Sequence, residues 1–326
     1  MSGVSAPGGV GTRRAARLRR RAAKRRAWGA TAIGAAAALI AFVGSPTASL
    51  SDARAATTGP GSALASASLA RSAVANTGVQ VRVLLVGDST ALTLGEGLGE
   101  AAPESQYDYV LFDAGIVGCG LAEGPEVEVM GEQDSVAPAC DGSTPAPGTP
   151  LAQQPWPVQW EHDIAVDHPN VVAVLAGRWE VLNREYQGGW TNILQPAFAA
   201  YVKAQLEMAS SMVNAAGARL VFLTAPCINE GVQPDGAPWP EESPARLAAY
   251  NELLKEVAAE HPDVDSVVDL GAAACPGGRY SATEGGATIR TVDGIHFSPE
   301  GGVMLAPYVM PQIVAAGRAQ AAASGL

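Results

Sequence analysis

The sequence contains few of the residues that build metal clusters or membrane bundles. It has four cysteines and four histidines in 326 residues, and no two cysteines are close enough to form the short-spaced pair of a structural zinc site. The longest apolar run, from Trp28 to Val43, is shorter than the roughly 20 residues that a membrane-spanning helix usually needs. No internal repeat is present, which excludes repeat architectures. The residue pattern implies neither a metal nor a cofactor.

Basic residues are scarce beyond the first 55 positions. Nine Lys or Arg lie between Arg13 and Arg26, directly before the apolar run, and the small-residue pattern Ala53-Arg54-Ala55 follows that run. This order is typical of a secretory signal, so we expect residues 1–55 to be a signal peptide or an uncleaved N-terminal signal anchor. Without them the chain has 11 basic and 31 acidic residues, a balance that disfavours binding to nucleic acid.

The remaining chain divides into a linker and one domain. Residues 56–80 are rich in Ala, Ser, Gly and Thr and have almost no large apolar side chains, which predicts a flexible linker. Residues 81–326 are numerous enough to bury a sizeable core. We therefore expect an extracytoplasmic protein that is either secreted or tethered to the membrane by its N-terminal segment.

The cysteines are even in number, as expected for disulfides in an exported chain. Three pairings are possible. We favour Cys119 with Cys140 and Cys227 with Cys275, because each bridge would tie down a long loop.

Apolar runs alternate with helical patterns along the domain. The runs are short and continuous, which indicates strands buried on both faces of a parallel sheet. They lie at Val81–Val86, Tyr109–Phe112, Val171–Leu175, Leu220–Thr224 and Val264–Leu270, and helices are predicted at Leu92–Ala101, Pro196–Ala216, Pro244–Glu260 and Pro299–Ala316. Ser243-Pro244 and Ser298-Pro299 each offer a serine cap with proline at the first helical position. The pattern predicts an α/β fold of three layers, α/β/α, with a five-stranded parallel sheet.

Ser89 stands at the end of the first predicted strand, in Gly87-Asp88-Ser89. Working residues of such sheets gather beyond the carboxyl ends of the strands. The serine is therefore either a nucleophile or the cap of the next helix. A nucleophilic serine needs a histidine base that is oriented by a carboxylate.

His296 is the candidate base, because Asp293 precedes it by three positions in VDGIHFSPEGG, just before the last predicted helix. That spacing lets the carboxylate reach one ring nitrogen while the other faces the serine. His162, His168 and His261 fall near helix ends and are predicted to be surface or capping residues.

With these residues the chain resembles the SGNH (GDSL-type) hydrolases, whose domain is flavodoxin-like. The resemblance implies that Ser89 is the nucleophile, Asp293 the orienting acid and His296 the base. It also implies that the backbone N–H groups of Ser89 and Gly118 are oxyanion donors, Gly118 matching the glycine of the second conserved block.

The third block departs from the family pattern of Gly-x-Asn-Asp. The segment here is Gly177-Arg178-Trp179-Glu180, so Arg178 or Trp179 takes the place of the asparagine that completes the oxyanion hole. In an alternative interpretation Arg178 pairs with Glu180 or another acid and Trp179 is packing. Losing one oxyanion donor typically slows an enzyme by 10²–10³.

This variant block looks more specifically like the extracytoplasmic SGNH domains of acyltransferase-fused envelope O-acetyltransferases. That resemblance implies serine-dependent acyl transfer or ester hydrolysis on a cell-envelope or extracellular glycan, and a separate membrane protein as acyl donor. A secreted esterase of small esters and a non-catalytic glycan-binding domain are the alternatives. Tryptophans in or beside predicted loops are candidates for stacking on sugars, with Trp179 and Trp239 the assigned substrate-binding residues and Trp156, Trp160 and Trp190 further candidates.

Overall fold

The computed structural model describes residues 80–325, so the predicted targeting segment and all but the last residue of the predicted linker lie outside the described residues. The main sheet has the predicted five parallel strands, in the order β2-β1-β5-β8-β9. This is the order of flavodoxin-like sheets. The strands are β1 (Val81–Gly87), β2 (Tyr109–Gly115), β5 (Val171–Leu175), β8 (Arg219–Leu223) and β9 (Asp265–Val268).

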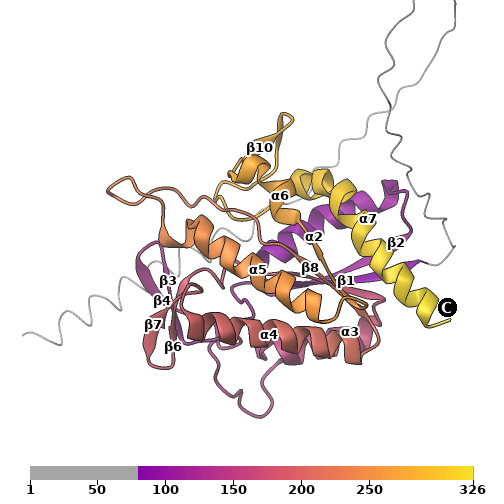
Figure 1. Ribbon diagram of the computed structural model, residues 1–326, viewed down its shortest axis with the longest axis horizontal. Coiled ribbons are helices and arrows are strands. Elements are labelled where there is room, and N and C mark those ends of the chain that lie inside the picture. The colour runs from indigo at the N-terminus through magenta and orange to yellow at the C-terminus, as the bar shows by residue number, and fades with distance from the viewer. Residues whose placement is uncertain (1–79, 326) are drawn as a thin grey trace, which may run out of the picture. The chain divides into compact units, whose positions relative to one another are not determined.

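Helices cover both faces of this sheet (Figure 1). Along β1, Val83 and Leu85 pack on one side with the helices α2 and α7, whereas Leu84 and Val86 pack on the other with α3, α4 and α5. The helices are α2 (Ser89–Ala101), α3 (Trp156–Asp167), α4 (Pro196–Ala215), α5 (Pro244–Glu260), α6 (Leu270–Ala274) and α7 (Pro299–Ala323). The three-layer prediction is confirmed, and no helix among residues 80–325 is long and apolar enough to span a membrane.

The differences from the predicted elements include one strand end and one helix cap. The last strand was expected to continue to Leu270, but it ends at Val268 because the Asp269 side chain accepts a hydrogen bond from the N–H of Ala272 and starts α6. Ser298 caps α7 as expected, through Gly301 N–H. Ser243 precedes α5 without any side-chain capping bond, so the fixed φ of Pro244 starts that helix without help from the serine.

A second sheet, which the sequence patterns did not predict, lies beside the main one. It is four-stranded and runs β4-β3-β6-β7, with β3 (Glu126–Val129), β4 (Glu132–Ser135), β6 (Asn183–Tyr186) and β7 (Gly189–Thr191). Tyr186 stacks on Tyr201 of α4 with ring centroids 4.7 Å apart, which anchors the sheet to the core. A short hairpin pairs β10 (Thr283–Glu284) with β11 (Ala287–Thr288).

Both disulfides join the predicted partners, Cys119 with Cys140 and Cys227 with Cys275. Each tethers a loop that follows a strand of the main sheet at its carboxyl end, β2 for the first bridge and β8 for the second. Two disulfides in one domain fit an oxidising compartment.

Candidate active site

Ser89 lies at the junction of β1 and α2, as its first helical residue, and Asp88 is the helix cap. Asp88 Oδ1 accepts a hydrogen bond of 2.7 Å from Thr90 N–H. Gly87 has a positive φ of 135°, and a Cβ there would overlap the carbonyl oxygen of Leu175, so only glycine permits this turn. Because Asp88 caps the helix, the Ser89 hydroxyl is left free to face another group.

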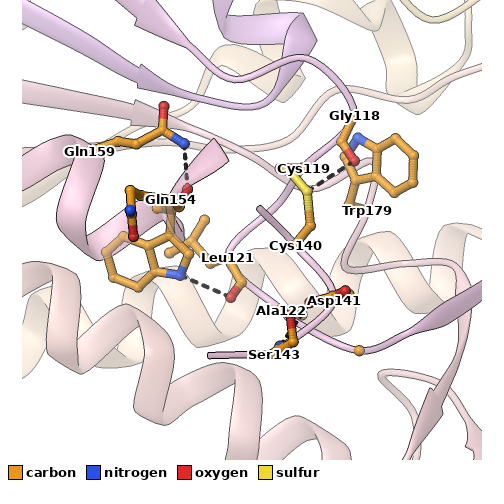
Figure 2. The surroundings of a disulfide bond; sticks show 12 residues. Gly118, Cys119, Leu121, Ala122, Cys140, Asp141, Ser143, Gln154, Gln159 and Trp179 are labelled. Carbon is orange, nitrogen blue, oxygen red and sulfur yellow. Dashed lines mark hydrogen bonds between the residues drawn. A yellow bond between two sulfur atoms is a disulfide. The ribbon is translucent and has the colours of Figure 1, made fainter. Parts of the chain in front are cut away.

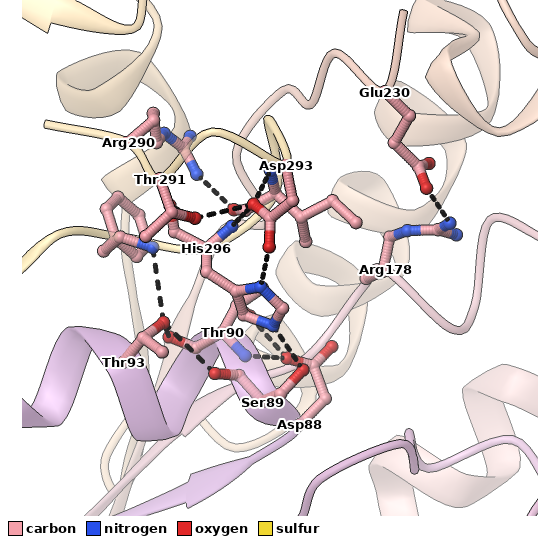
Figure 3. A network of polar contacts seen from close by, with 12 residues as sticks. Asp88, Ser89, Thr90, Thr93, Arg178, Glu230, Arg290, Thr291, Asp293 and His296 are labelled. Carbon is pink, nitrogen blue, oxygen red and sulfur yellow. Dashed lines mark hydrogen bonds and ion pairs between the residues drawn. The ribbon is translucent and has the colours of Figure 1, made fainter. Parts of the chain in front are cut away.

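That group is His296. Its Nε2 lies 2.8 Å from Ser89 Oγ, and its Nδ1 lies 2.6 Å from Asp293 Oδ2. Figure 3 shows the three side chains in one line, with the imidazole between hydroxyl and carboxylate. The structure thus brings together the predicted nucleophile, base and acid from the two ends of the domain, in the arrangement that activates a serine.

Asp293 is held as a carboxylate. Its Oδ1 accepts hydrogen bonds from Thr291 Oγ1 at 2.6 Å, Ile295 N–H at 2.9 Å and His296 N–H at 3.2 Å. Partial burial works to raise the pKa of Asp293, but these bonds and the one to the imidazole outweigh it and hold the pKa well below its ordinary value. The negative charge needed opposite an imidazolium is therefore present throughout the physiological range.

Arg290 fixes the turn that carries Asp293. The guanidinium is buried against the Phe297 ring and donates to the carbonyls of Ile295 at 2.8 Å and Cys227 at 3.1 Å. Burial lowers its pKa to about 10. Gly294, with a φ of 73°, lies so close to Asn229 that a Cβ would overlap the Asn229 carbonyl. The sequence patterns did not identify Arg290. Its position three residues before Asp293 was the one indication that it could support the site.

Gly118 lies in the loop after β2, next to the disulfide of Cys119 and Cys140 (Figure 2). The loop starts from Gly115, where a Cβ would come within 2.8 Å of the carbonyl oxygen of Asp88. This close approach places Gly115, from which the loop starts, against the first turn of α2.

Trp179 packs on the same loop. A Cβ at Gly118 would be 3.9 Å from its ring, and Figure 2 shows the indole beside Gly118. The side chain is partly exposed, but its Nε1 is buried and has no hydrogen-bond partner in the described part of the chain. The ring therefore packs against the loop that carries Gly118, while its N–H is buried in the protein.

Arg178 is committed to an acid from another loop. Its Nη2 lies 2.7 Å from Glu230 Oε1 and 3.9 Å from Glu241 Oε1, and the side chains of Arg178 and Glu230 are 6% and 4% exposed. Figure 3 shows the guanidinium directed toward Glu230. The contact agrees with the alternative interpretation of the third block, in which Arg178 pairs with an acid. That acid is Glu230 and not Glu180.

Replacing Glu230 by glutamine is expected to lower the free energy of unfolding by about 3 kcal/mol, because a buried guanidinium loses its closest counter-charge. Urea unfolding at neutral pH measures the change. Glu252→Gln, which removes the exposed partner of Lys255, is the matched control and should cost less than about 1 kcal/mol. Equal effects of the two substitutions would contradict the structural role of the Arg178 ion pair.

The remaining tryptophans and histidines divide between core and surface. Trp156 and Trp160 are buried, and their ring centroids lie 4.6 Å apart with the rings tilted, so they belong to the core and are not exposed for stacking on a sugar. Trp239 lies against Gly131 in the turn between β3 and β4, and Trp190 of β7 is 44% exposed. The histidines outside the triad lie on or at the ends of helices: His162 in α3, and His168 and His261 at the C-caps of α3 and α5.

Comparison with known proteins gives one family. A profile described as "SGNH domain (fused to AT3 domains)" matches residues 62–311. Comparison with curated proteins finds no significant match.

Solved structures with a similar chain trace include three esterases. An acetyl xylan esterase, AlAXEase, is 16% identical over 72% of this chain and 100% of its own, with a TM-score of 0.43. The native aryl esterase of M. smegmatis is 12% identical over 72% and 99%, with a TM-score of 0.44. A carbohydrate acetylesterase from Sinorhizobium meliloti is 14% identical over 72% and 99%, with a TM-score of 0.44. Because the profile matches most of the chain, this protein belongs to the SGNH domain family, in the group found fused to AT3 domains, and it has the residues for the ester chemistry of that family.

Proposed function

We propose that this protein is an extracytoplasmic O-acyltransferase or esterase that forms an acyl-serine at Ser89 and acts on a cell-envelope or extracellular glycan. The observation that carries the proposal is the unbroken chain of hydrogen bonds from Ser89 Oγ through His296 to Asp293. A helix cap would need no such chain, and Asp88 already supplies the cap.

The first half of the mechanism is acylation. His296 Nε2 takes the proton of Ser89 as Oγ attacks the ester carbonyl, and Asp293 stabilises the imidazolium. The N–H groups of Ser89 and Gly118 stabilise the oxyanion. His296 then gives its proton to the leaving alcohol, and an acyl-serine remains. Arg178 has no part in this step, since its guanidinium is bound to Glu230.

The second half depends on the acceptor. Water at His296 regenerates Ser89 and releases the acid, whereas a sugar hydroxyl in the same place yields an acylated glycan. Rings of the kind that stack on sugars are offered by Trp179 beside Gly118, Trp190 on β7 and Trp239 against the turn between β3 and β4. The family's association with AT3 domains supports transfer, with a separate membrane protein supplying the acyl group.

The experiment measures both products from one activated acetyl ester. The full chain is incubated with the ester, with and without a glycan oligosaccharide, and free acetate and acetylated oligosaccharide are quantified. Acetylated oligosaccharide formed in preference to acetate establishes a transferase, and acetate alone establishes an esterase. The absence of Ser89-dependent turnover on any ester would overturn the proposal in favour of a binding domain.

A further inference from the structure

Two carboxylates are buried next to the triad, and the mechanism gives neither a chemical step. Asp88 and Glu180 are both 0% exposed. Each has one oxygen, Asp88 Oδ2 and Glu180 Oε2, without a hydrogen-bond partner among residues 80–325, and the buried hydroxyl of Tyr250 shares that condition. Such carboxylates are unusual, because burying a charged group costs free energy unless the charge is paired or hydrogen-bonded.

Glu180 binds the loop that carries Gly118, here called the oxyanion loop (residues 116–122). Its Oε1 accepts hydrogen bonds from Leu121 N–H at 2.6 Å and Ala122 N–H at 3.2 Å. Between them and Gly118, Gly120 touches the same carboxyl group so closely that a Cβ there would overlap Oε1. The position of the oxyanion loop therefore depends on Glu180, which stands at the end of the third conserved block.

Burial and the neighbouring Asp88 disfavour the ionised form of Glu180. Burial is the main cause that raises its pKa, the neighbouring Asp88 carboxylate raises it further, and together they bring it to about 7. Burial also raises the pKa of Asp88. Arg184 and the two backbone N–H groups work in the opposite direction, and Tyr250 faces both acids from α5. Two buried carboxylates that repel each other do not both ionise readily.

We propose that Glu180 is a positioning residue that holds the oxyanion loop in its neutral, protonated form and leaves the buried negative charge to Asp88. The inference deepens the proposed function, on which it rests. In the neutral form Oε1 keeps both hydrogen bonds to the loop, and the proton resides on Oε2. Ionisation would add a second buried charge beside Asp88 and displace the carboxyl group together with the loop.

The pH dependence has a definite sign. The folded-state pKa of Glu180 is raised above its ordinary value of 4.5 to about 7, so the folded state holds this proton more tightly than the unfolded chain does. Glu180 therefore reduces stability progressively as pH rises from about 4.5 to about 7, and the full reduction persists above that range. Glutamine, a neutral group of nearly the same shape, removes this dependence.

The test compares Glu180→Gln and Glu180→Ala with wild type. All proteins are full-length, and Ser89→Ala is the blank for activity. We expect the kcat of the glutamine variant at pH 6 to lie within about threefold of the wild-type kcat. Its free energy of unfolding relative to wild type should increase as pH rises from about 5 to 8. We expect the alanine variant to lose about 10- to 100-fold in kcat with little change in KM, as for a weakened oxyanion donor. Glu185→Gln, in which the replaced carboxyl lies on β6, is the matched control and should change neither quantity.

Three results would overturn the inference. Loss of kcat in the glutamine variant equal to that in the alanine variant would mean that the ionised carboxylate is required. Unchanged kcat in both would mean that Glu180 does not position the loop. A stability difference between wild type and the glutamine variant that does not vary with pH would mean that Glu180 is not neutral. Unfolding measurements need no turnover, so absence of Ser89-dependent activity with a pH-dependent stability difference would count against the proposed function and not against the protonation state.

Discussion

Ser89→Ala is expected to reduce turnover of an activated acetyl ester by about 10⁴- to 10⁶-fold. Without Oγ no acyl-enzyme forms, and only the residual rate enhancement from oxyanion donors and binding remains. The fold should be unaffected, because within residues 80–325 the Ser89 hydroxyl bonds to His296 alone, while Asp88 caps the helix. Steady-state kinetics gives the rate, and thermal unfolding within about 2 °C of wild type shows that the loss is chemical.

A serine elsewhere in the domain provides the control. Ser105 accepts a hydrogen bond from Tyr107 N–H beyond the far end of α2, and Ser105→Ala should leave turnover unchanged. A fluorophosphonate should label wild type and the Ser105 variant but not the Ser89 variant. Turnover above about 1% of wild type in a homogeneous Ser89→Ala preparation would refute the nucleophile assignment.

The main sheet could be predicted because its signal is local. Its central strands β1, β5 and β8 are short, mostly apolar and mostly buried runs. Continuous hydrophobicity is the sequence pattern that indicates burial on both faces of a sheet. The second sheet carries no such signal. Its edge strand β4 is Glu-Gln-Asp-Ser and is fully exposed, and β3 pairs with β6 across the chain, Val127 opposite Arg184. Strands that are stabilised by pairing with a distant segment cannot be recognised from their own composition.

The hydrogen-bonded arrangement of Ser89, His296 and Asp293 could be predicted from the sequence, but the contacts around it could not. Ser89, Asp293 and His296 stand in short motifs whose spacing is tied to their chemistry. The partner of Arg178 is Glu230, 52 positions away, whereas the sequence alone allowed Glu180 or another acid. Glu180 points to the other side, at the backbone of Leu121 and Ala122. Ion pairs and buried hydrogen bonds depend on how loops return to the sheet, which one sequence does not specify.

Asp293→Asn is expected to lower kcat by about 10⁴-fold while leaving the position of His296 almost unchanged. The asparagine oxygen can still accept from Thr291 and from the N–H groups of Ile295 and His296, as Asp293 Oδ1 does. Its amide nitrogen then faces Nδ1 of the imidazole as a donor. The ring responds by carrying its proton on Nε2, where it points at Ser89 and cannot accept the serine proton.

The effect on stability separates this tautomer change from a loss of the carboxylate's structural bonds. The pKa of Asp293 is held below its ordinary value, so the carboxylate stabilises the fold above about pH 4, and this contribution is lost as pH falls further. The stability difference between wild type and Asp293→Asn should therefore shrink on acidification. Asp235→Asn, in an exposed loop where Asp235 accepts a hydrogen bond from Ala237 N–H, should change neither kcat nor the pH profile. Activity of Asp293→Asn within tenfold of wild type would show that another group orients His296, and the hydrogen-bond chain from Ser89 to Asp293 would then no longer support an acyl-serine mechanism.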